Sequence, residues 1–488
     1  RYLNRYAKIR RPGKAKPPRL VDALMQNDPL HFQSLSGVCR QLKSGALSSV
    51  ELTRYMLERC QSVDANLGSY ARLMADSALA EAAACDRAQH QGDALGALHG
   101  VPIAIKDLLF TEDAVTASGT EVMKDFRADF DATVVTRLRE AGAVIIGKTQ
   151  LTEGAYGSHH PSIKAPVNPW SVDAWSGVSS SGSGVAVAAG LAFAALGSDT
   201  GGSIRFPSAC NGLVGLKPTY GRVSLHGAFP LANSLDHIGP MTRNVEDAAR
   251  VLGVIAGFDS KDPNSVDTVV PGYVSAMGNL QQPLTVGVDW SYVSEGVAPS
   301  ATQVIHDAIA AVGDHVDVKE IAMPPSYHRL AVDWGKTCAV ECLRAHADFY
   351  PAQASKYGPG LIWLLELGRS TSAEEYAELQ ALRDLFRDQL EALFTQVDVV
   401  LAPTMPITAP TVDEMERSSL RADSAPFLSF TAPFDYSGHP TLNLPAGIDP
   451  EGMPRSLQLI AARFDETKLL AAGALFEKVL GPLEYPQL

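Results

Sequence analysis

The stretch that decides the fold is "SGVSSSGSGVAVAAGLAFAALGSDTGGSIRFPSACNG", residues 176–212. Eight serines and eight glycines lie in it, a density that is typical of a flexible linker. Yet residues 185–197 carry no charged or polar side chain, as a buried segment would. A linker gains nothing from a buried centre, so we interpret the stretch as two polar loops joined by a core element. We predict a helix over residues 185–191 and a strand over residues 193–197.

The preceding segments continue this alternation of helices and strands. The stretch "HGVPIAIKD" predicts a buried strand over residues 101–105 that ends at Lys106. The stretch "GAVIIGKT" predicts a strand over residues 143–146, after a helix that stops at Gly142. Further buried strands are predicted within "LVGLKPT", "LTVGVDW" and "VDVVLAPT".

Helices dominate two other regions. Residues 28–90 are predicted to be helical, and Ser48 and Glu51 stand there at capping-box spacing. A second capping box begins a helix predicted over residues 373–394. We interpret residues 300–395 as a helical cover over one edge of the sheet.

The pattern as a whole favours an α/β fold. We predict a single large domain with a central mixed, mostly parallel β-sheet covered by helices on both faces. This domain is assigned to residues 28–488, and a basic N-terminal tail to residues 1–27. The first 20 residues carry eight Lys or Arg and no acid. A solvated tail is favoured over a nucleic-acid or membrane tail, because charge runs are usually solvated.

Composition limits the classes of partner that the protein can bind and indicates its cellular compartment. The formal net charge of −13 argues against nucleic acid as a partner. The longest apolar run is too short to span a membrane, so we expect no membrane partner. Six cysteines without a CxxC pattern suit a reducing compartment, and we expect a cytoplasmic protein. The adjacent His159 and His160 point in different directions, so we expect neither a metal nor a cofactor.

Motifs for nucleotide binding and for common serine nucleophiles are absent or out of context. Residues 142–149 match the letters GxxxxGK[ST], but a helix comes first and the four variable positions read as the strand itself. We interpret this match as chance. The nucleophile elbow GxSxG and the SxxK pattern do not occur. A histidine-based triad stays open, because twelve histidines are present and none stands in a distinguishing motif.

One turn, "SDTGGSIRFP" at residues 198–207, meets the needs of acyl transfer. That chemistry needs a hydroxyl that a base deprotonates, and backbone N–H groups that converge on the developing oxyanion. Gly201 and Gly202 let the backbone turn sharply at the end of a buried strand. Ser203 would then open a short helix, whose positive dipole end favours an oxyanion. A tight glycine turn with a capping serine explains the same residues when they are taken alone.

Four segments together resemble the amidase signature family of serine hydrolases, over residues from about 30 to about 485. They are "GVPIAIKD", "GVSSSGS", "GSDTGGSIRFPSACNGLVGLKPTYGRVS" and "PTLNLPAGIDPEGMPRSLQLIA". The resemblance implies a Ser–cis-Ser–Lys triad. In it Ser203 is the nucleophile, Ser179 the bridging serine after a cis peptide bond, and Lys106 the base. It also implies an oxyanion hole and supporting residues: Thr200, Gly201, Gly202 and Ser203 for the hole, and Ser180, Asp199 and Arg205 as supports.

The first serine cluster departs from the family pattern. Where the family usually reads GGSSGGS, this chain reads "GVSSSGS", with Val178 and Ser181 in place of glycines. Both serine positions implied by the resemblance remain. We therefore expect an intact triad beside a locally altered loop.

Lys106 must be neutral to act as a base. A free lysine has a pKa of about 10.4, and burial can lower that pKa by several units. The apolar strand "VPIAIK" delivers Lys106 into such a site. Neutral Lys106 would accept the proton of Ser179, and Ser179 that of Ser203. Strand alternation should point the neighbouring Asp107 elsewhere, since facing Lys106 it would raise that pKa.

The resemblance predicts a hydrolase of carboxylic amides or related acyl bonds, including aryl amides and carbamates, that acts on a small molecule. The alternative is the glutaminase subunit of a tRNA-dependent amidotransferase, which usually carries a basic run after its "YG". Here the matching stretch is "YGPGLIWLLELG", and Ile362, Trp363 and Leu364 occupy the basic positions. A buried glutamine carboxylate would lose its cationic partner, which disfavours this alternative. A catalytically inactive binding module is disfavoured because the three triad positions are present.

The substrate pocket is the part that the sequence determines least. The apolar run at residues 361–365 either faces a hydrophobic acyl or amine group or belongs to a core helix, and the second interpretation is slightly favoured. Tyr156, Ser158 and Trp175 flank the matched loops and are predicted to line the pocket, although packing explains them nearly as well. The resemblance implies a monomer or a homodimer.

Overall fold

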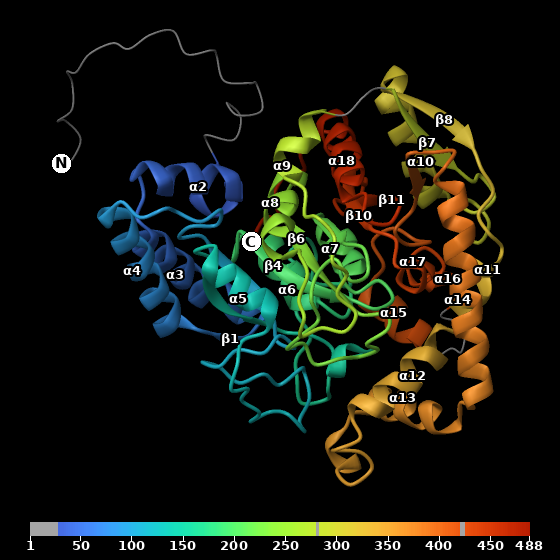
Figure 1. Ribbon diagram of the computed structural model, residues 1–488, viewed down its shortest axis with the longest axis horizontal. Helices are drawn as coiled ribbons and strands as arrows, with labels where there is room; N and C mark the ends of the chain where they lie inside the picture. The colour runs from blue at the N-terminus through green and yellow to red at the C-terminus, as the bar shows by residue number, and fades with distance from the viewer. Residues whose placement is uncertain (1–27, 280–282, 420–424) are drawn as a thin grey trace.

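Eleven strands of the described chain form one mixed sheet through the middle of the molecule (Figure 1). The computed structural model describes residues 28–279, 283–419 and 425–488, so the predicted basic tail lies outside the described residues. The strand order is β1-β3-β2-β4-β6-β5-β10-β11-β9-β7-β8. The strands are β1 Tyr70–Leu73, β2 Pro102–Lys106, β3 Val144–Thr149, β4 Ala194–Asp199, β5 Val214–Lys217, β6 His237–Thr242, β7 Leu284–Val288, β8 Val316–Glu320, β9 Val399–Ala402, β10 Thr441–Ile448 and β11 Pro454–Ala461.

Helices surround this sheet, with α2 to α5 on one side of the view in Figure 1 and α12 to α14 on the other. They are α2 Leu35–Ser44, α3 Ser49–Leu67, α4 Ala75–Gln91, α5 Thr133–Glu140, α6 Ser181–Ala188, α7 Arg205–Asn211, α8 Val245–Ile255, α9 Tyr273–Ala276, α10 Pro299–Val312, α11 Ser326–Val332, α12 Trp334–Ala345, α13 Pro359–Ser370, α14 Ala373–Leu393, α15 Val412–Ser419, α16 Ala425–Leu428, α17 Ala432–Ser437 and α18 Glu466–Leu480. Among the described residues, none of these helices has the length and apolar character that crossing a membrane requires.

Parallel pairing is confined to two parts of the sheet. Strand β2 lies parallel between β3 and β4, and β7 lies parallel between β8 and β9. The other six pairings in the described chain are antiparallel. The predicted α/β fold with one mixed sheet is confirmed, but antiparallel pairs outnumber the parallel ones. The reason is that β5 connects to β6, and β10 to β11, without a crossover helix.

Both faces of the central strands are covered, as predicted. Every residue of β2, β3, β4, β5, β6 and β9 is buried. Strands that are buried throughout must be packed on both faces. Helix α6 packs against β2 and β4, while α18 packs against β10 and β11.

The local elements predicted around residues 176–212 are present with shifted ends. Helix α6 begins at Ser181 and β4 runs on to Asp199, so the polar clusters themselves enter the helix and the strand. Both predicted capping boxes form, at the starts of α3 and α14. In each, the serine hydroxyl and the glutamate side chain satisfy one another's backbone N–H groups.

Five strands lie where no strand was predicted, β1, β6, β8, β10 and β11, and three of them show why. Strand β1 lies within residues 28–90, which were predicted to be helical, and it pairs with the end of β3. Strand β6 carries Pro240 opposite Leu196 of β4, and a proline within an apolar run argues against a strand. Strand β8 exposes four of its five residues at the edge of the sheet, so no apolar pattern marks it.

Residues 300–395 contain this edge strand as well as helices. Helix α10 packs against α18 and β11, next to the sheet. Helices α11 to α14 pack against one another and against α16 and α17. We use the term helical cover for α11 to α14 only, because these helices pack together, and α12 and the start of α13 contact the region of the candidate site.

Candidate active site

Two serine-containing loops meet beyond the end of β4. The first serine loop, residues 176–180, leads into α6, and the second serine loop, residues 200–204, follows β4. The N–H of Ser180 donates a hydrogen bond to the carbonyl oxygen of Ser203 (3.3 Å), which ties the loops together. The peptide bond that precedes Ser179 is cis. Ser179 is buried, whereas Ser203 is partly exposed, so of these two hydroxyls a substrate reaches that of Ser203.

Lys106 lies beneath these loops as the last residue of β2, and its side chain is fully buried. Its Nζ donates hydrogen bonds to the Oγ atoms of Ser179 (2.7 Å), Ser180 (2.8 Å) and Ser198 (2.9 Å). All three of these partners are neutral hydroxyls. The structure therefore brings Lys106 and Ser179 into direct contact, and it adds Ser198, which the sequence analysis had not identified.

Burial lowers the pKa of Lys106 to about 7, although the nearby Asp199 and Asp236 act in the opposite direction. An ammonium group loses its hydration when it enters a water-free site, so the neutral amine is favoured there. Near neutral pH, Lys106 is consequently able to accept a proton.

The expectation for Asp107 is confirmed. Its carboxylate contacts Nζ of Lys148 (3.2 Å) and the guanidinium of Arg72 (3.1 Å), on the side of the strand away from Lys106. Lys148 is the lysine of the GxxxxGK[ST] match, and it is buried in β3, where it also donates to the carbonyl of Val115 (3.0 Å). The match is thus part of a strand, as interpreted from the sequence.

Asp199 holds the second serine loop from its inner side. Its carboxylate accepts hydrogen bonds from the N–H groups of Gly202 (2.6 Å), Ile204 (3.0 Å) and Arg205 (3.3 Å). The guanidinium of Arg205 donates two more, at 2.9 Å and 2.8 Å. Burial alone would raise the pKa of Asp199, but Arg205 outweighs burial and holds that pKa well below its usual range. The loop is therefore built around an ionised carboxylate.

Arg205 also connects this loop to the C-terminal third of the chain. It donates to the carboxylate of Asp435 on α17 (2.7 Å) and to the carbonyl of Thr431 (3.1 Å). The side chains of Asp199, Arg205 and Asp435 are fully buried. Burial and the charge of Asp199 raise the pKa of Asp435. Removing one member of such a buried ion cluster typically costs about 3–5 kcal/mol, because the others are left unpaired.

Three N–H groups of the second serine loop stay available for a ligand. Those of Gly202 and Ile204 are used by Asp199. Those of Thr200, Gly201 and Ser203 donate no hydrogen bond to any described residue. Gly202 has a φ of 133°, and a Cβ there would lie 2.4 Å from the ring of Phe206, so this position requires glycine. The geometry leaves the amides of Thr200, Gly201 and Ser203 as candidates for an oxyanion hole, whereas the amide of Gly202 is already used.

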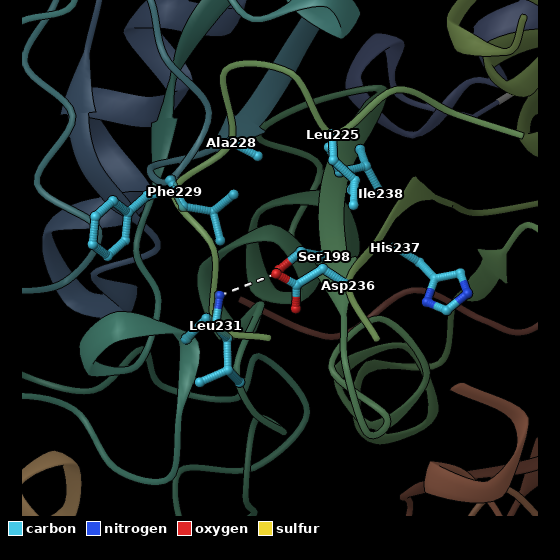
Figure 2. A pocket seen from close by; sticks show the side chains of 10 residues that line it. Ser198, Leu225, Ala228, Phe229, Leu231, Asp236, His237 and Ile238 are labelled. Carbon is cyan, nitrogen blue, oxygen red and sulfur yellow. Dashed lines mark hydrogen bonds between the residues drawn. The ribbon is translucent and has the colours of Figure 1, made fainter. Parts of the chain in front are cut away.

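Asp236, which the sequence analysis missed, lies just before β6 and beside Ser198, and Figure 2 shows its hydrogen bond from the N–H of Leu231. Its carboxylate accepts hydrogen bonds from Oγ1 of Thr200 (2.6 Å) and from the N–H groups of Leu231 (3.0 Å) and Ala232 (3.1 Å). Burial raises the pKa of Asp236 to about 7. Asp236 and Ser198 line a cavity of about 10 Å³, which has room for one water at most and does not admit a substrate.

Tyr156 and Trp175 reach the second serine loop through different neighbours. Tyr156 stacks on Trp334, with ring centroids 6.1 Å apart, and the indole N–H of Trp334 donates to the carbonyl of Thr200 (2.9 Å). Trp175 packs against Phe206 in the first turn of α7, at 6.2 Å. Both predicted pocket residues thus lie one aromatic ring away from the loop that carries Ser203.

Ser158, which was predicted to line the pocket, is exposed, and the contact that it makes near the site comes from its main-chain carbonyl. Its carbonyl accepts a hydrogen bond from the N–H of Glu153 (3.0 Å). The buried carboxylate of Glu153 in turn accepts one from the N–H of Gly358, at the start of α13 (3.0 Å). Nearby, Nε2 of His159 lies 3.0 Å from Oγ of Ser181. This segment joins the start of α6, directly after the first serine loop, to the start of α13 in the helical cover.

Comparison with known proteins identifies the family. A family model described as Amidase matches residues 51–470. The chain belongs to the amidase family. The Mycobacterium tuberculosis protein named "Putative amidase AmiD" is 44% identical over 468 residues, which cover 96% of this amidase and 97% of that protein. A glutamyl-tRNA(Gln) amidotransferase subunit of Halorhodospira halophila is 37% identical, with coverage of 92% and 98%.

Solved structures agree with this assignment. A bacterial aryl acylamidase of the amidase signature family aligns with a TM-score of 0.83 at 25% identity, covering 93% of this amidase and 97% of that chain. The family and these relatives make this amidase an amide-hydrolysing enzyme.

Proposed function

We propose that this amidase hydrolyses carboxylic amides through an acyl-enzyme on Ser203, with Ser179 and Lys106 as a proton relay. The observation that carries the proposal is the 2.7 Å contact between Nζ of Lys106 and Oγ of Ser179 in a fully buried setting. Burial makes the amine a base near neutral pH, and its position gives it a hydroxyl to deprotonate. Ser180, Ser198 and the carboxylate of Asp199 support this arrangement.

The acylation half of the reaction begins with attack by Ser203. Its Oγ bonds to the carbonyl carbon of the amide while its proton passes to Ser179, and the proton of Ser179 passes to Lys106. The amides of Gly201 and Ser203 donate to the oxyanion that forms. The C–N bond then breaks, and the proton returns from Lys106 through Ser179 to the leaving nitrogen. An amine departs and an ester on Ser203 remains.

The deacylation half uses the same relay with water as the nucleophile. Water loses a proton to Ser179, and Ser179 passes its own to Lys106, while the water oxygen bonds to the acyl carbon. The C–O bond to Ser203 breaks and Ser203 regains a proton. The products are a carboxylic acid and the regenerated enzyme, so one water is consumed for each amide cleaved.

The preferred amide is proposed to be uncharged at its acyl and amine groups, with aryl amides as the leading class. Ile362, Trp363 and Leu364, where the amidotransferase subunits usually carry basic residues, offer no cation. Leu361, Leu364 and Leu365 are buried in the core, so this run acts mainly as a core helix, whereas Trp363 is 57% exposed. The aromatic residues Tyr156 and Trp175 beside the second serine loop support an apolar pocket.

We propose that the enzyme acts as a cytoplasmic monomer or homodimer, with residues 28–488 as its single domain. All six cysteines are free, and all but Cys85 are buried. Unpaired cysteines are usual in proteins of reducing compartments.

A fluorophosphonate probe tests the proposal directly. We expect the wild-type protein to take up one equivalent of probe, on the peptide that contains Ser203, as measured by intact-mass and peptide mass spectrometry. Prior heat denaturation should abolish labelling, because the reactivity of Ser203 depends on the folded relay. Labelling of another residue, or none in a protein that hydrolyses anilides, would refute the assignment of Ser203.

Asp236→Asn is expected to move the acid limb of the pH profile of kcat/KM to lower pH. Asp236, whose own pKa is about 7, is ionised in the upper part of this range, where its negative charge favours the ammonium form of Lys106; its removal there lowers the apparent pKa of Lys106 further. Because the relay needs the neutral amine, activity then persists at lower pH. The measurement is kcat/KM against one amide from pH 5 to 9, with thermal unfolding as the check on folding. An acid limb that moves to higher pH would contradict the electrostatic role.

A further inference from the structure

Trp334 is the point at which the helical cover contacts the second serine loop. It is the first residue of α12, more than a hundred residues beyond that loop in the chain. Its indole N–H donates to the carbonyl oxygen of Thr200 (2.9 Å). No sequence motif marked it, and neither the resemblance nor the comparisons assign it a role.

The ring of Trp334 also explains why residue 201 is glycine. A Cβ built on Gly201 would lie 2.6 Å from Cε2 and Cζ2 of the indole, closer than atoms can approach. The edge of the indole that carries the N–H therefore lies against the backbone of Gly201, which holds one of the three free N–H groups. A side chain at residue 201 would push the helical cover and the loop apart.

Because the peptide bond is planar, the hydrogen bond from Trp334 to the carbonyl of Thr200 also fixes the direction of the N–H of Gly201. The carbonyl of Thr200 and the N–H of Gly201 belong to one peptide group, and they point in opposite directions across its plane. A donor that fixes the carbonyl therefore also fixes where the N–H points. On the same residue, the hydroxyl of Thr200 is held by Asp236 (2.6 Å), so the peptide group has little freedom to rotate.

We propose that Trp334 is a positioning residue for the oxyanion hole, which holds the carbonyl of Thr200 and so aims the N–H of Gly201 at the oxygen of the scissile amide. The inference rests on the proposed role of Ser203 as nucleophile. It makes the helical cover part of the catalytic geometry: the ring of Trp334 stacks on Tyr156, which follows the turn joined to α13 through Glu153 and Gly358.

The test is Trp334→Phe, which keeps an aromatic ring and removes the N–H donor. We expect kcat to fall about tenfold with KM within about twofold, because one hydrogen bond of the hole is misaimed rather than deleted. The second-order rate of labelling by a fluorophosphonate should fall by a similar factor, since that reagent also develops charge on oxygen. The matched control is Trp290→Phe, a tryptophan that stacks on His306 of α10 and has no part in the candidate site, which should leave both rates unchanged.

Several outcomes would overturn the inference. If Trp334→Phe labels and turns over at wild-type rates, the indole N–H has no part in positioning. If Trp334→Phe raises KM and leaves kcat unchanged, Trp334 contacts the bound substrate and does not position the oxyanion hole. If the phenylalanine variant does not fold, benzothienylalanine in place of Trp334 keeps the bicyclic ring and replaces the N–H by sulfur, and the same losses are expected. A wild-type protein that is never labelled on Ser203 would instead refute the proposed function.

Discussion

Ser203→Ala is expected to lower kcat/KM for amide hydrolysis by about 10⁵-fold or more, since removal of a serine nucleophile has effects of that order. The residual rate would come from substrate binding and from the oxyanion hole alone. The variant should keep its stability within about 0.5 kcal/mol, because Ser203 is partly exposed and surface changes of this kind have small effects. Its main-chain carbonyl would still accept the hydrogen bond from Ser180.

The measurements are steady-state kinetics on a panel of anilides, aliphatic amides, esters and carbamates, together with fluorophosphonate labelling. The variant should bind the competitive product acid as the wild type does, which separates loss of chemistry from loss of binding. Ser62→Ala, at an exposed serine on α3, is the matched control and should be fully active. Full turnover by Ser203→Ala would show that the nucleophile lies elsewhere.

Lys106→Met is expected to lower kcat by about 10³-fold or more, because it removes the base of the relay while filling nearly the same volume. Ser179 would remain in place but would have no acceptor for its proton. Lys106→Arg should not restore activity, since a guanidinium stays protonated and cannot act as a base. The acid limb that the wild type shows near the pKa of Lys106, about 7, should be absent from the residual activity.

The effect of Lys106→Met on the free energy of unfolding should depend on pH in a direction that the pKa of Lys106 determines. In the folded protein the pKa of Lys106 is about 7, whereas in the unfolded chain it is about 10.4. Between these values the unfolded chain binds more protons, so Lys106 makes the wild type more stable as pH rises through this window. At pH 7 and below, the unfolding free energy of Lys106→Met should therefore exceed that of the wild type by the largest amount. Between pH 7 and about pH 10 the wild type should gain roughly 4 kcal/mol of stability relative to the variant.

Urea unfolding of both proteins at pH 7 and pH 10 measures this difference. Lys148→Met is a useful comparison, because Lys148 is also buried but contacts Asp107 directly. A stability difference for Lys106→Met that does not change with pH would show that Lys106 keeps an ordinary pKa. In that case the kinetic loss would need another explanation.

Features of the molecule that depend on neighbours in sequence were predictable. Ser48 with Glu51 forms its capping box because every atom involved lies within one helical turn. The opposite facings of Lys106 and Asp107 follow from the two-residue period of a strand. The placement of Ser179 and Ser203 came from the resemblance, and their two loops do meet, because α6 and β4 return the chain to the same edge of the sheet.

Features that depend on distant segments were not predictable in the same way. Nothing local distinguishes Trp334 or Asp236 from other residues of their type, and each acts only through Thr200. The excess of antiparallel pairs depends on which strands become neighbours, which apolar patterning does not specify. Strand β8 pairs along one edge while exposing most of its side chains, so its sequence resembles that of a loop.

The bond between Arg205 and Asp435 makes the second serine loop depend on a segment that the ribosome adds much later. When β4 and α7 have been synthesised, the three proposed triad residues are present, yet the partner of Arg205 on α17 is still 230 residues away. Until α17 packs against α7, Arg205 has Asp199 as its carboxylate partner but lacks Asp435. The charge balance of this buried cluster is therefore completed late in synthesis, after the residues that it supports.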